Sequence, residues 1–170
     1  QLLLSDTDVN SEDVTFHNGN KFDADDVVST ISYTSDPKHV FEFKSRYTWV
    51  EKIEKLGPYK IRLTGKTPNA MDLGLLGYRT YIQDKESFDP LENKCDYGRL
   101  TPYGTGPYKV ASIDKNAGIV VESFDGFKGD PKYNRAPVKR IHGIPVPDRQ
   151  TQIAKLMASE VDMLRNVTPD

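Results

Sequence analysis

The fold of this chain is decided by residues 14–28, which read VTFHNGNKFDADDVV. Val14 and Phe16 alternate with polar neighbours, which predicts a short strand over residues 14–17. Asn18-Gly19 predicts a turn, because both residue types tolerate positive φ. Asp23 is a good helix N-cap, and the acidic residues after it suit the positive end of a helix dipole. The stretch therefore predicts a strand, a turn and a helix that ends near residue 34.

The rest of the chain continues with hairpins and short helices. Gly57-Pro58 separates two alternating segments and predicts an antiparallel hairpin, and a second hairpin is predicted on either side of residues 115–118. The expected strands are Trp49–Leu56, Tyr59–Thr64, Gly106–Asp114, Gly118–Phe124, Val138–Val146 and Val161–Leu164, and the expected helices are Pro68–Leu76 and Asp148–Ser159. The stretch Asp84–Pro102 is polar and irregular, with weak helical character over Asp84–Phe88.

Composition removes several classes of function. The chain has 170 residues, with 23 basic and 25 acidic side chains and a net charge of −2, so it lacks the clustered basic face that nucleic acid requires. The longest apolar runs, Leu2–Leu4 and Gly118–Val121, fall far short of the roughly 20 residues of a membrane-spanning helix. A single cysteine, Cys95, excludes an internal disulfide and a multi-cysteine metal site, and is either an inert small hydrophobe or a reactive thiol.

Motifs for catalysis or cofactor binding are weak. The stretch Gly104–Lys109 begins like a dinucleotide fingerprint, but it ends in Lys, and Pro107 and a following strand do not suit the helix start that the fingerprint needs. The three histidines lie far apart in sequence, and helix capping explains the acidic residues 23–26 better than a cation does. Composition leaves a pair of glycosidase-type carboxylates open. We therefore predict no catalytic residue, metal or cofactor.

Aromatic residues gather before the first hairpin. Phe41, Phe43, Tyr47 and Trp49 all have odd numbers, so an extended segment would place them on one face. Two interpretations remain open: a strand facing the core, or an aromatic wall lining a ligand pocket.

The stretch 14–28 resembles the signature of family 5 extracellular solute-binding proteins, in which Phe-His-(Asp/Asn)-Gly precedes a helix opening with Ala-(Glu/Asp)-Asp-Val-Val. Three further stretches resemble family motifs in the same order, namely Trp49–Leu63, Tyr103–Val110 and Asp148–Met163. The resemblance extends from Val14 to Asp170. Two features depart from it: Asp6–Asp13 is acidic where the family has an aromatic-rich strand, and Ser159 stands where the family usually has Gly.

The resemblance implies an α/β fold, namely a mixed-sheet fragment of lobe one of a type II periplasmic-binding-protein fold. Residues 1–103 would form part of the small subdomain of lobe one and residues 104–170 part of its main sheet, with the second lobe absent. Because family members are much longer, the chain is expected to be an internal piece of a larger protein, which also accounts for the lack of a signal peptide.

The implied function is capture without chemistry. The chain would belong to the periplasmic, or extracellular and lipid-anchored, substrate-binding component of an ABC importer, with a small solute and the permease as partners and no contact with the membrane otherwise. An enzyme or sensor that has borrowed the fold is the alternative, and a stand-alone interaction domain is a third possibility. The ligand could be a peptide, a nickel complex, a sugar or an opine.

The resemblance also places two segments beside the ligand cleft. The first contains Phe43 and Tyr47, which can stack on a ligand or hydrogen-bond to it. The second contains Arg79 and Tyr81, and an arginine beside aromatic rings suits a carboxylate. The alternative for Arg79 is a solvated surface ion pair. The predicted ligand-binding residues are therefore Phe43, Tyr47, Arg79 and Tyr81, and tight binding is not expected from this chain by itself.

Overall fold

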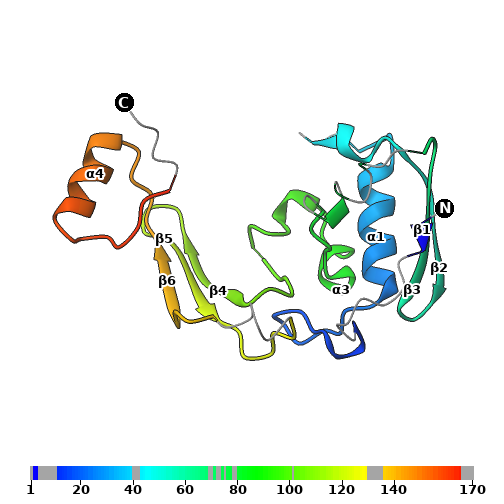
Figure 1. Cartoon of the computed structure of the whole chain (residues 1–170), viewed down its shortest axis with the longest axis horizontal. Coiled ribbons are helices and arrows are strands. Elements are labelled where there is room, and N and C mark those ends of the chain that lie inside the picture. Colours follow the sequence, from blue (N-terminus) through cyan, green and yellow to red (C-terminus); the bar gives the residue numbers. More distant parts are fainter. Residues whose placement is uncertain are drawn as a thin grey trace.

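The computed structural model describes residues 2–3, 11–39, 43–68, 71, 74, 76–77, 80–100, 102–129 and 136–165. These residues form helices and two three-stranded antiparallel sheets that lie at opposite ends of the molecule (Figure 1). We call the described residues up to 100 the N-terminal unit and residues 102–165 the C-terminal unit. The α/β class predicted from the sequence is confirmed.

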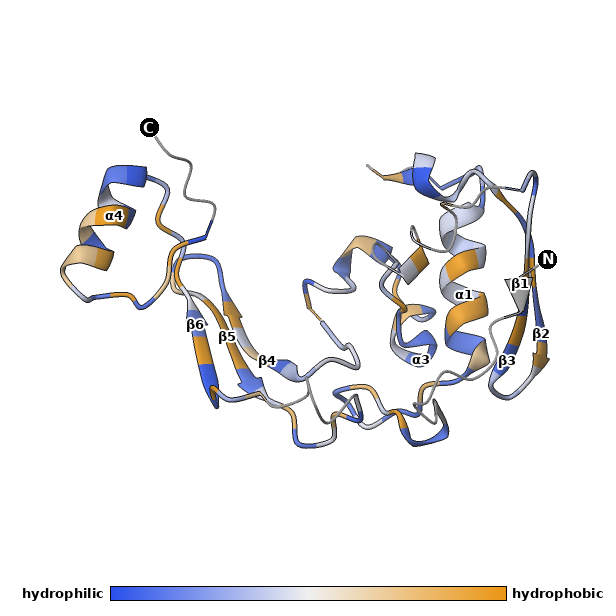
Figure 2. Ribbon diagram, in the orientation of Figure 1, coloured by the Kyte–Doolittle hydropathy of each residue, from blue (hydrophilic) through white to orange (hydrophobic). Residues whose placement is uncertain are grey.

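The N-terminal unit is one helix packed on one sheet. Helix α1 (Ala24–Ser35) covers a sheet with the strand order β1 (Leu2–Leu3), β3 (Lys60–Gly65), β2 (Val50–Gly57). Ile31 from the helix meets Val50 and Leu63 from the sheet, and Val27, Trp49, Ile53 and Leu76 pack around them. Figure 2 shows the apolar residues of α1 as a stripe along part of the helix, as expected for an element that buries one face. The predicted helix and first hairpin are both confirmed.

Asp23 begins α1 as predicted. Its side chain accepts a hydrogen bond from the Asp25 N–H, while the Asp26 side chain accepts one from the Asp23 N–H at 2.9 Å. This reciprocal capping box supplies acceptors for backbone donors that the first helical turn leaves without partners.

The described residues also include four short helices, of which η2 and α3 contact α1. They are η1 (Ser11–Asp13), η2 (Lys44–Tyr47), α3 (Lys85–Phe88) and η3 (Lys94–Asp96). Phe88 anchors α3: its buried ring meets Tyr33 of α1 edge-on at 5.0 Å between centroids and Tyr97 at 5.6 Å. The helical character predicted for residues 84–88 is therefore confirmed.

The C-terminal unit consists of β4 (Tyr108–Asp114), β5 (Gly118–Ser123), β6 (Arg140–Gly143) and α4 (Arg149–Met157). The strands pair in that order, so the second hairpin is confirmed and β6 is an edge strand. Ile113 pairs with Ile119, and Val121 pairs with Ile141, which places these four side chains on one face. The three isoleucines are 39–46% exposed, so this apolar face is only half covered.

Three predicted strands are wrong or reduced, and one of them is the strand predicted over 138–146, which spans only Arg140–Gly143. Residues 161–164 are irregular, with a bend at Asp162, and form no strand. The strand expected over 14–17 is a single bridge between Thr15 and Lys21, because the chain reverses at once through the Asn18-Gly19 turn. The helix predicted over 68–76 lies largely outside the described residues. Of the loop predicted over 125–137, residues 125–129 and 136–137 are irregular as predicted, and residues 130–135 lie outside the described residues.

The turn that follows α4 has Ser159 at the position where the family usually has Gly. Ser159 has φ 57°, and the N–H groups of Ser159 and Glu160 donate to the carbonyls of Leu156 and Lys155. This is the Schellman pattern, which usually has glycine at the left-handed position. The serine therefore accepts a left-handed backbone, a conformation that is costly for a residue with a Cβ.

Candidate functional site

The Asn18-Gly19 turn is built as predicted. Gly19 has φ 93°, its N–H donates to the Phe16 carbonyl at 2.9 Å, and the Phe16 N–H donates to the Asn20 carbonyl at 2.8 Å. Phe16 is fully buried beneath the turn. The turn consequently holds the Asn18 and Asn20 side chains on one side, where both reach the same partner.

That partner is Asp84, a fully buried carboxylate at the start of α3. It accepts hydrogen bonds from Asn18 Nδ2 at 2.6 Å, from Asn20 Nδ2 at 3.0 and 3.1 Å, and from the Ser87 hydroxyl. Its own backbone N–H donates to the Tyr97 hydroxyl at 2.8 Å. Asp84 thus joins the signature turn to a segment more than 60 residues later in the chain.

Asp26 makes a second tie of the same kind. Its Oδ1 accepts from the Lys85 N–H at 2.8 Å while its Oδ2 caps α1. Nearby, the Thr30 hydroxyl accepts from the Gln83 N–H at 2.9 Å. Helix α1 and the 83–85 segment are therefore held together by buried polar groups whose hydrogen-bond partners lie in the protein.

Asp26, Asp84 and Glu86 form a carboxylate cluster, with one oxygen of each lying within 4.8 Å of the others. Burial raises the pKa of Asp26 above its usual value. Burial also acts to raise the pKa of Asp84, but hydrogen bonds from Ser87, Asn20 and Asn18 outweigh it and leave that pKa lowered. Burial raises the pKa of Tyr97 to about 12. The oxygens of Asp26 and Asp84 already accept protein hydrogen bonds, so we interpret the cluster as a structural tie.

His17 joins the two units. Its backbone N–H donates to the Gly104 carbonyl at 2.9 Å, its Nε2 lies 3.0 Å from the Gly106 carbonyl oxygen, and its Nδ1 lies 3.3 Å from the Gly104 nitrogen. The Phe124 ring meets the imidazole edge-on at 5.0 Å between centroids. Two of the stretches that carried the family resemblance, around residues 17 and 104, therefore meet in space.

A small hollow opens beside this joint. It has a volume of about 230 Å³ and is lined by His17, by Leu100, Pro102 and Tyr103, and by one stretch of β4, Lys109–Ile113. Pockets that enclose drug-sized ligands usually exceed about 300 Å³. The hollow could therefore hold only part of a larger ligand.

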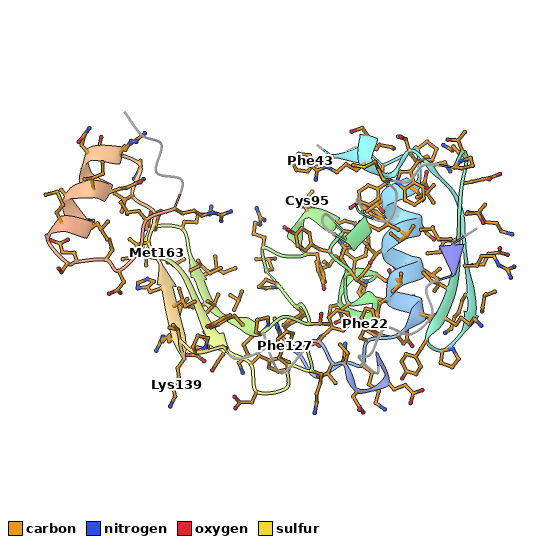
Figure 3. All side chains as sticks on the ribbon, viewed as in Figure 1. Phe22, Phe43, Cys95, Phe127, Lys139 and Met163 are labelled. Atoms are coloured by element: carbon orange, nitrogen blue, oxygen red, sulfur yellow. The ribbon has the colours of Figure 1, made fainter. Side chains whose placement is uncertain are left out.

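The predicted ligand-binding residues differ in how accessible they are. Phe43 is 45% exposed and stacks under the Arg46 guanidinium at 3.9 Å, whereas Tyr47 is only 8% exposed. Tyr81 is 84% exposed, and Arg79 lies outside the described residues. Figure 3 shows Phe43 and Cys95 on the edge of the N-terminal unit that looks toward the second sheet.

The parity argument for an aromatic wall is wrong. Residues 44–47 form the helix η2 rather than an extended segment, so odd-numbered side chains do not share a face. The structure instead separates them: Tyr47 is buried, Trp49 packs at the core, and Phe43 is exposed with Arg46 over its ring. Phe41 lies outside the described residues.

Sequence reasoning missed the Asp84 network and the His17 joint. Both depend on contacts between segments more than 60 residues apart, which no local pattern encodes. One signal was available for Asp84, since two asparagines flank a positive-φ glycine and leave amide groups that need an acceptor.

The fold is an α/β fragment of the kind found in type II periplasmic binding proteins. Residues 11–170 match the model of the bacterial extracellular solute-binding proteins, family 5 Middle. The chain therefore belongs to this family.

Known proteins that are similar in sequence or structure support this family assignment. The oligopeptide-binding protein AppA of Bacillus subtilis is 28% identical over 156 residues, which cover 88% of this chain and 27% of AppA. The glutathione-binding protein GsiB of Escherichia coli K12 is 26% identical over 88% of this chain and 28% of GsiB. The structure of AppA with a nonapeptide matches with a TM-score of 0.74 and 25% identity, over 87% of this chain and 29% of AppA. The periplasmic binding protein DppA of Helicobacter pylori, in complex with the peptide STSA, matches with a TM-score of 0.70 and 26% identity, over 87% and 32%. The chain thus spans less than a third of the length of these relatives.

Proposed function

We propose that this chain supplies part of the substrate-binding component of an ABC importer and that the solute is an oligopeptide or a related small molecule. The observation that carries the proposal is the family match over residues 11–170. The solved structures of AppA and DppA, which are 25% and 26% identical to this chain, are both complexes with peptides. In this function the protein binds and releases its solute without chemical change, and binding energy favours the closed form that the permease recognises.

Within such a component, residues 1–103 would form part of the small subdomain of lobe one and residues 104–170 part of its main sheet. The half-covered apolar face of β4–β5–β6 supports this assignment. Ile113, Ile119 and Ile141 remain 39–46% exposed on one face, and an apolar sheet face of this kind ordinarily packs against another layer. A second lobe would complete the ligand site.

The proposed site of action is outside the cytoplasm, in the periplasm or at the cell surface, since the family is one of extracellular solute-binding proteins. Within the described residues, no helix combines the length and apolar character needed to cross a bilayer. Contact with the membrane would be made through the permease or a lipid anchor.

For ligand contact we propose Phe43 and Tyr81, whose side chains are exposed, together with Arg79 as the partner of a peptide carboxylate. Tyr47 is buried, so its part would be to support the η2 turn that presents Phe43. A guanidinium suits a carboxylate because it can donate two parallel hydrogen bonds.

The test is calorimetric titration of the full-length polypeptide that carries this chain with a small set of oligopeptides. Arg79→Ala is expected to weaken binding by roughly 1.5–3 kcal/mol, as for a charge-assisted hydrogen bond. Arg99→Ala is a matched control, because Arg99 pairs with Asp96 on an exposed surface. An affinity within twofold of the parent for Arg79→Ala would remove Arg79 from the site, and failure of every peptide to bind would overturn the proposed function.

A further inference from the structure

We infer that His17 is a positioning residue: its neutral ring, protonated on Nε2, fixes how the C-terminal unit sits on the N-terminal unit. Three hydrogen bonds between described residues of the two units involve this one residue. They all end on the Gly104–Gly106 segment, which leads directly into β4. A change at His17 therefore acts at the point where the chain crosses from one unit to the other.

The bonding partners select one form of the imidazole. The Gly106 carbonyl can only accept, so Nε2 must carry a proton to bond with it. The Gly104 N–H can only donate, so Nδ1 must be unprotonated to accept from it. The other neutral tautomer satisfies neither partner, and the doubly protonated ring would turn an N–H toward the Gly104 N–H. Only the Nε2–H form satisfies both contacts.

Packing holds the ring in that orientation. The Phe124 ring meets the imidazole edge-on at 5.0 Å with an interplanar angle of 73°. The Phe124 N–H in turn donates to the Pro107 carbonyl at 2.8 Å. Gly104–Pro107 is thus held from one side by His17 and from the other by the residue that follows β5. The joint therefore links the N-terminal unit to the start of β4 and to the residue that follows β5.

There is room for a side chain beside both glycines of the joint. A Cβ built on Gly104 would lie 3.7 Å from His17 Cε1, and one built on Gly106 would meet nothing within 4 Å. Steric need for glycine therefore does not explain these two positions, and the contacts that the structure gives this segment toward the N-terminal unit are the hydrogen bonds to His17. Loss of the two side-chain bonds should leave both units folded and still tied by the His17 N–H and by the Tyr97 hydroxyl, which donates to the Tyr103 carbonyl at 2.9 Å, with a wider range of relative angles.

The chain offers a direct way to measure that angle. Cys95 is the only cysteine in the sequence, and it is exposed in the N-terminal unit. Lys115 is exposed at the β4–β5 turn of the C-terminal unit. Spin labels on Cys95 and on Lys115→Cys report the distance between the units by double electron–electron resonance, in the 170-residue chain itself.

His17→Phe keeps a ring for the Phe124 contact and removes both side-chain hydrogen bonds, so we expect a shifted and broadened distance distribution. His17→Gln can present an acceptor and a donor in place of the two ring nitrogens, and we expect it to restore the parent distance. His39→Phe is the matched control, because the His39 ring bonds to the Tyr33 carbonyl and stacks on Tyr33 within the N-terminal unit. It should leave the distance unchanged.

An unchanged narrow distribution in His17→Phe would overturn the inference, as would an equal change in His39→Phe. Nitrogen-15 NMR of the parent chain provides a second test if His17→Phe fails to fold. The inference requires a protonated Nε2 and an unprotonated Nδ1 at His17, and a ring protonated on Nδ1 would contradict it.

Discussion

Asp84→Ala should destabilise the N-terminal unit severely. Asp84 is fully buried and accepts hydrogen bonds from Asn18, Asn20 and Ser87. The alanine variant removes the Asp84 acceptor from two amide groups and a hydroxyl, and among the described residues only Asn18 Nδ2 keeps a second acceptor, Ser87 Oγ at 3.1 Å. Hydrogen bonds to a charged group contribute about 1.5–3 kcal/mol each, and water can recover part of the loss at the more exposed Asn18. We therefore expect a loss of about 3–4 kcal/mol in the free energy of unfolding.

The assay is urea unfolding followed by the fluorescence of Trp49, the only tryptophan, which packs against the core of the same unit. A loss of this size would be a large part of the roughly 5–15 kcal/mol that holds a typical domain together. Asp89→Ala is the matched control, since Asp89 is exposed and pairs with Lys85 at 3.0 Å one turn away. That surface pair should contribute less than about 1 kcal/mol.

Two results would refute the reasoning. If Asp84→Ala costs no more than Asp89→Ala, the buried hydrogen bonds do not stabilise the fold as the geometry indicates. If added calcium or magnesium raises the unfolding midpoint of the parent and Asp84→Ala abolishes that effect, the Asp26, Asp84 and Glu86 cluster is a cation site rather than a structural tie.

Three further predictions concern the same unit and the second sheet. Gly19→Val should cost about 1–3 kcal/mol, because φ is 93° and no neighbour lies within 4 Å, so the cost is conformational; an unchanged melting temperature would exclude this turn geometry. Gly118→Ala should lower the melting temperature more than Gly106→Ala does, because a Cβ on Gly118 would lie 2.0 Å from the Gly143 carbonyl oxygen whereas the space around Gly106 is open. Equal melting temperatures for the two variants would contradict the β5–β6 register. The backbone N–H of Glu86 acts to lower its pKa, but the hydrogen bond to Asp84 and burial leave that pKa raised above 4.5. A group whose pKa is raised in the folded state contributes stability that is present below pH 4.5 and is lost as the pH rises through the folded value. The stability of Glu86→Gln relative to the parent should therefore increase between pH 4 and pH 7. A constant difference in melting temperature over that range would contradict this.

Local chemistry predicted most of the elements. Asp23 could be assigned as an N-cap because its side chain and the acidic residues after it act within one helical turn. Gly19 and the hairpin around Gly57 could be assigned because positive φ and alternating polarity are properties of a few neighbouring residues. These signals are short in range, and so are the structures that they specify.

Long-range contacts could not be predicted in the same way. Asp84 lies 66 residues from Asn18, and His17 lies 89 residues from Gly106, so neither contact leaves a local pattern. The aromatic parity failed because residues 44–47 coil into η2. The candidate ligand residues follow from the family resemblance, and only Phe43 and Tyr81 among them have exposed side chains in the part of the chain that the structure describes.

The proposed function is tested most directly by native mass spectrometry of the full-length polypeptide that carries this chain, purified from its host without a refolding step. We expect a complex whose added mass resolves into one or more oligopeptides or related small molecules and disappears when the protein is denatured. A protein that carries no small solute and also fails to take up added peptides would contradict the proposed function.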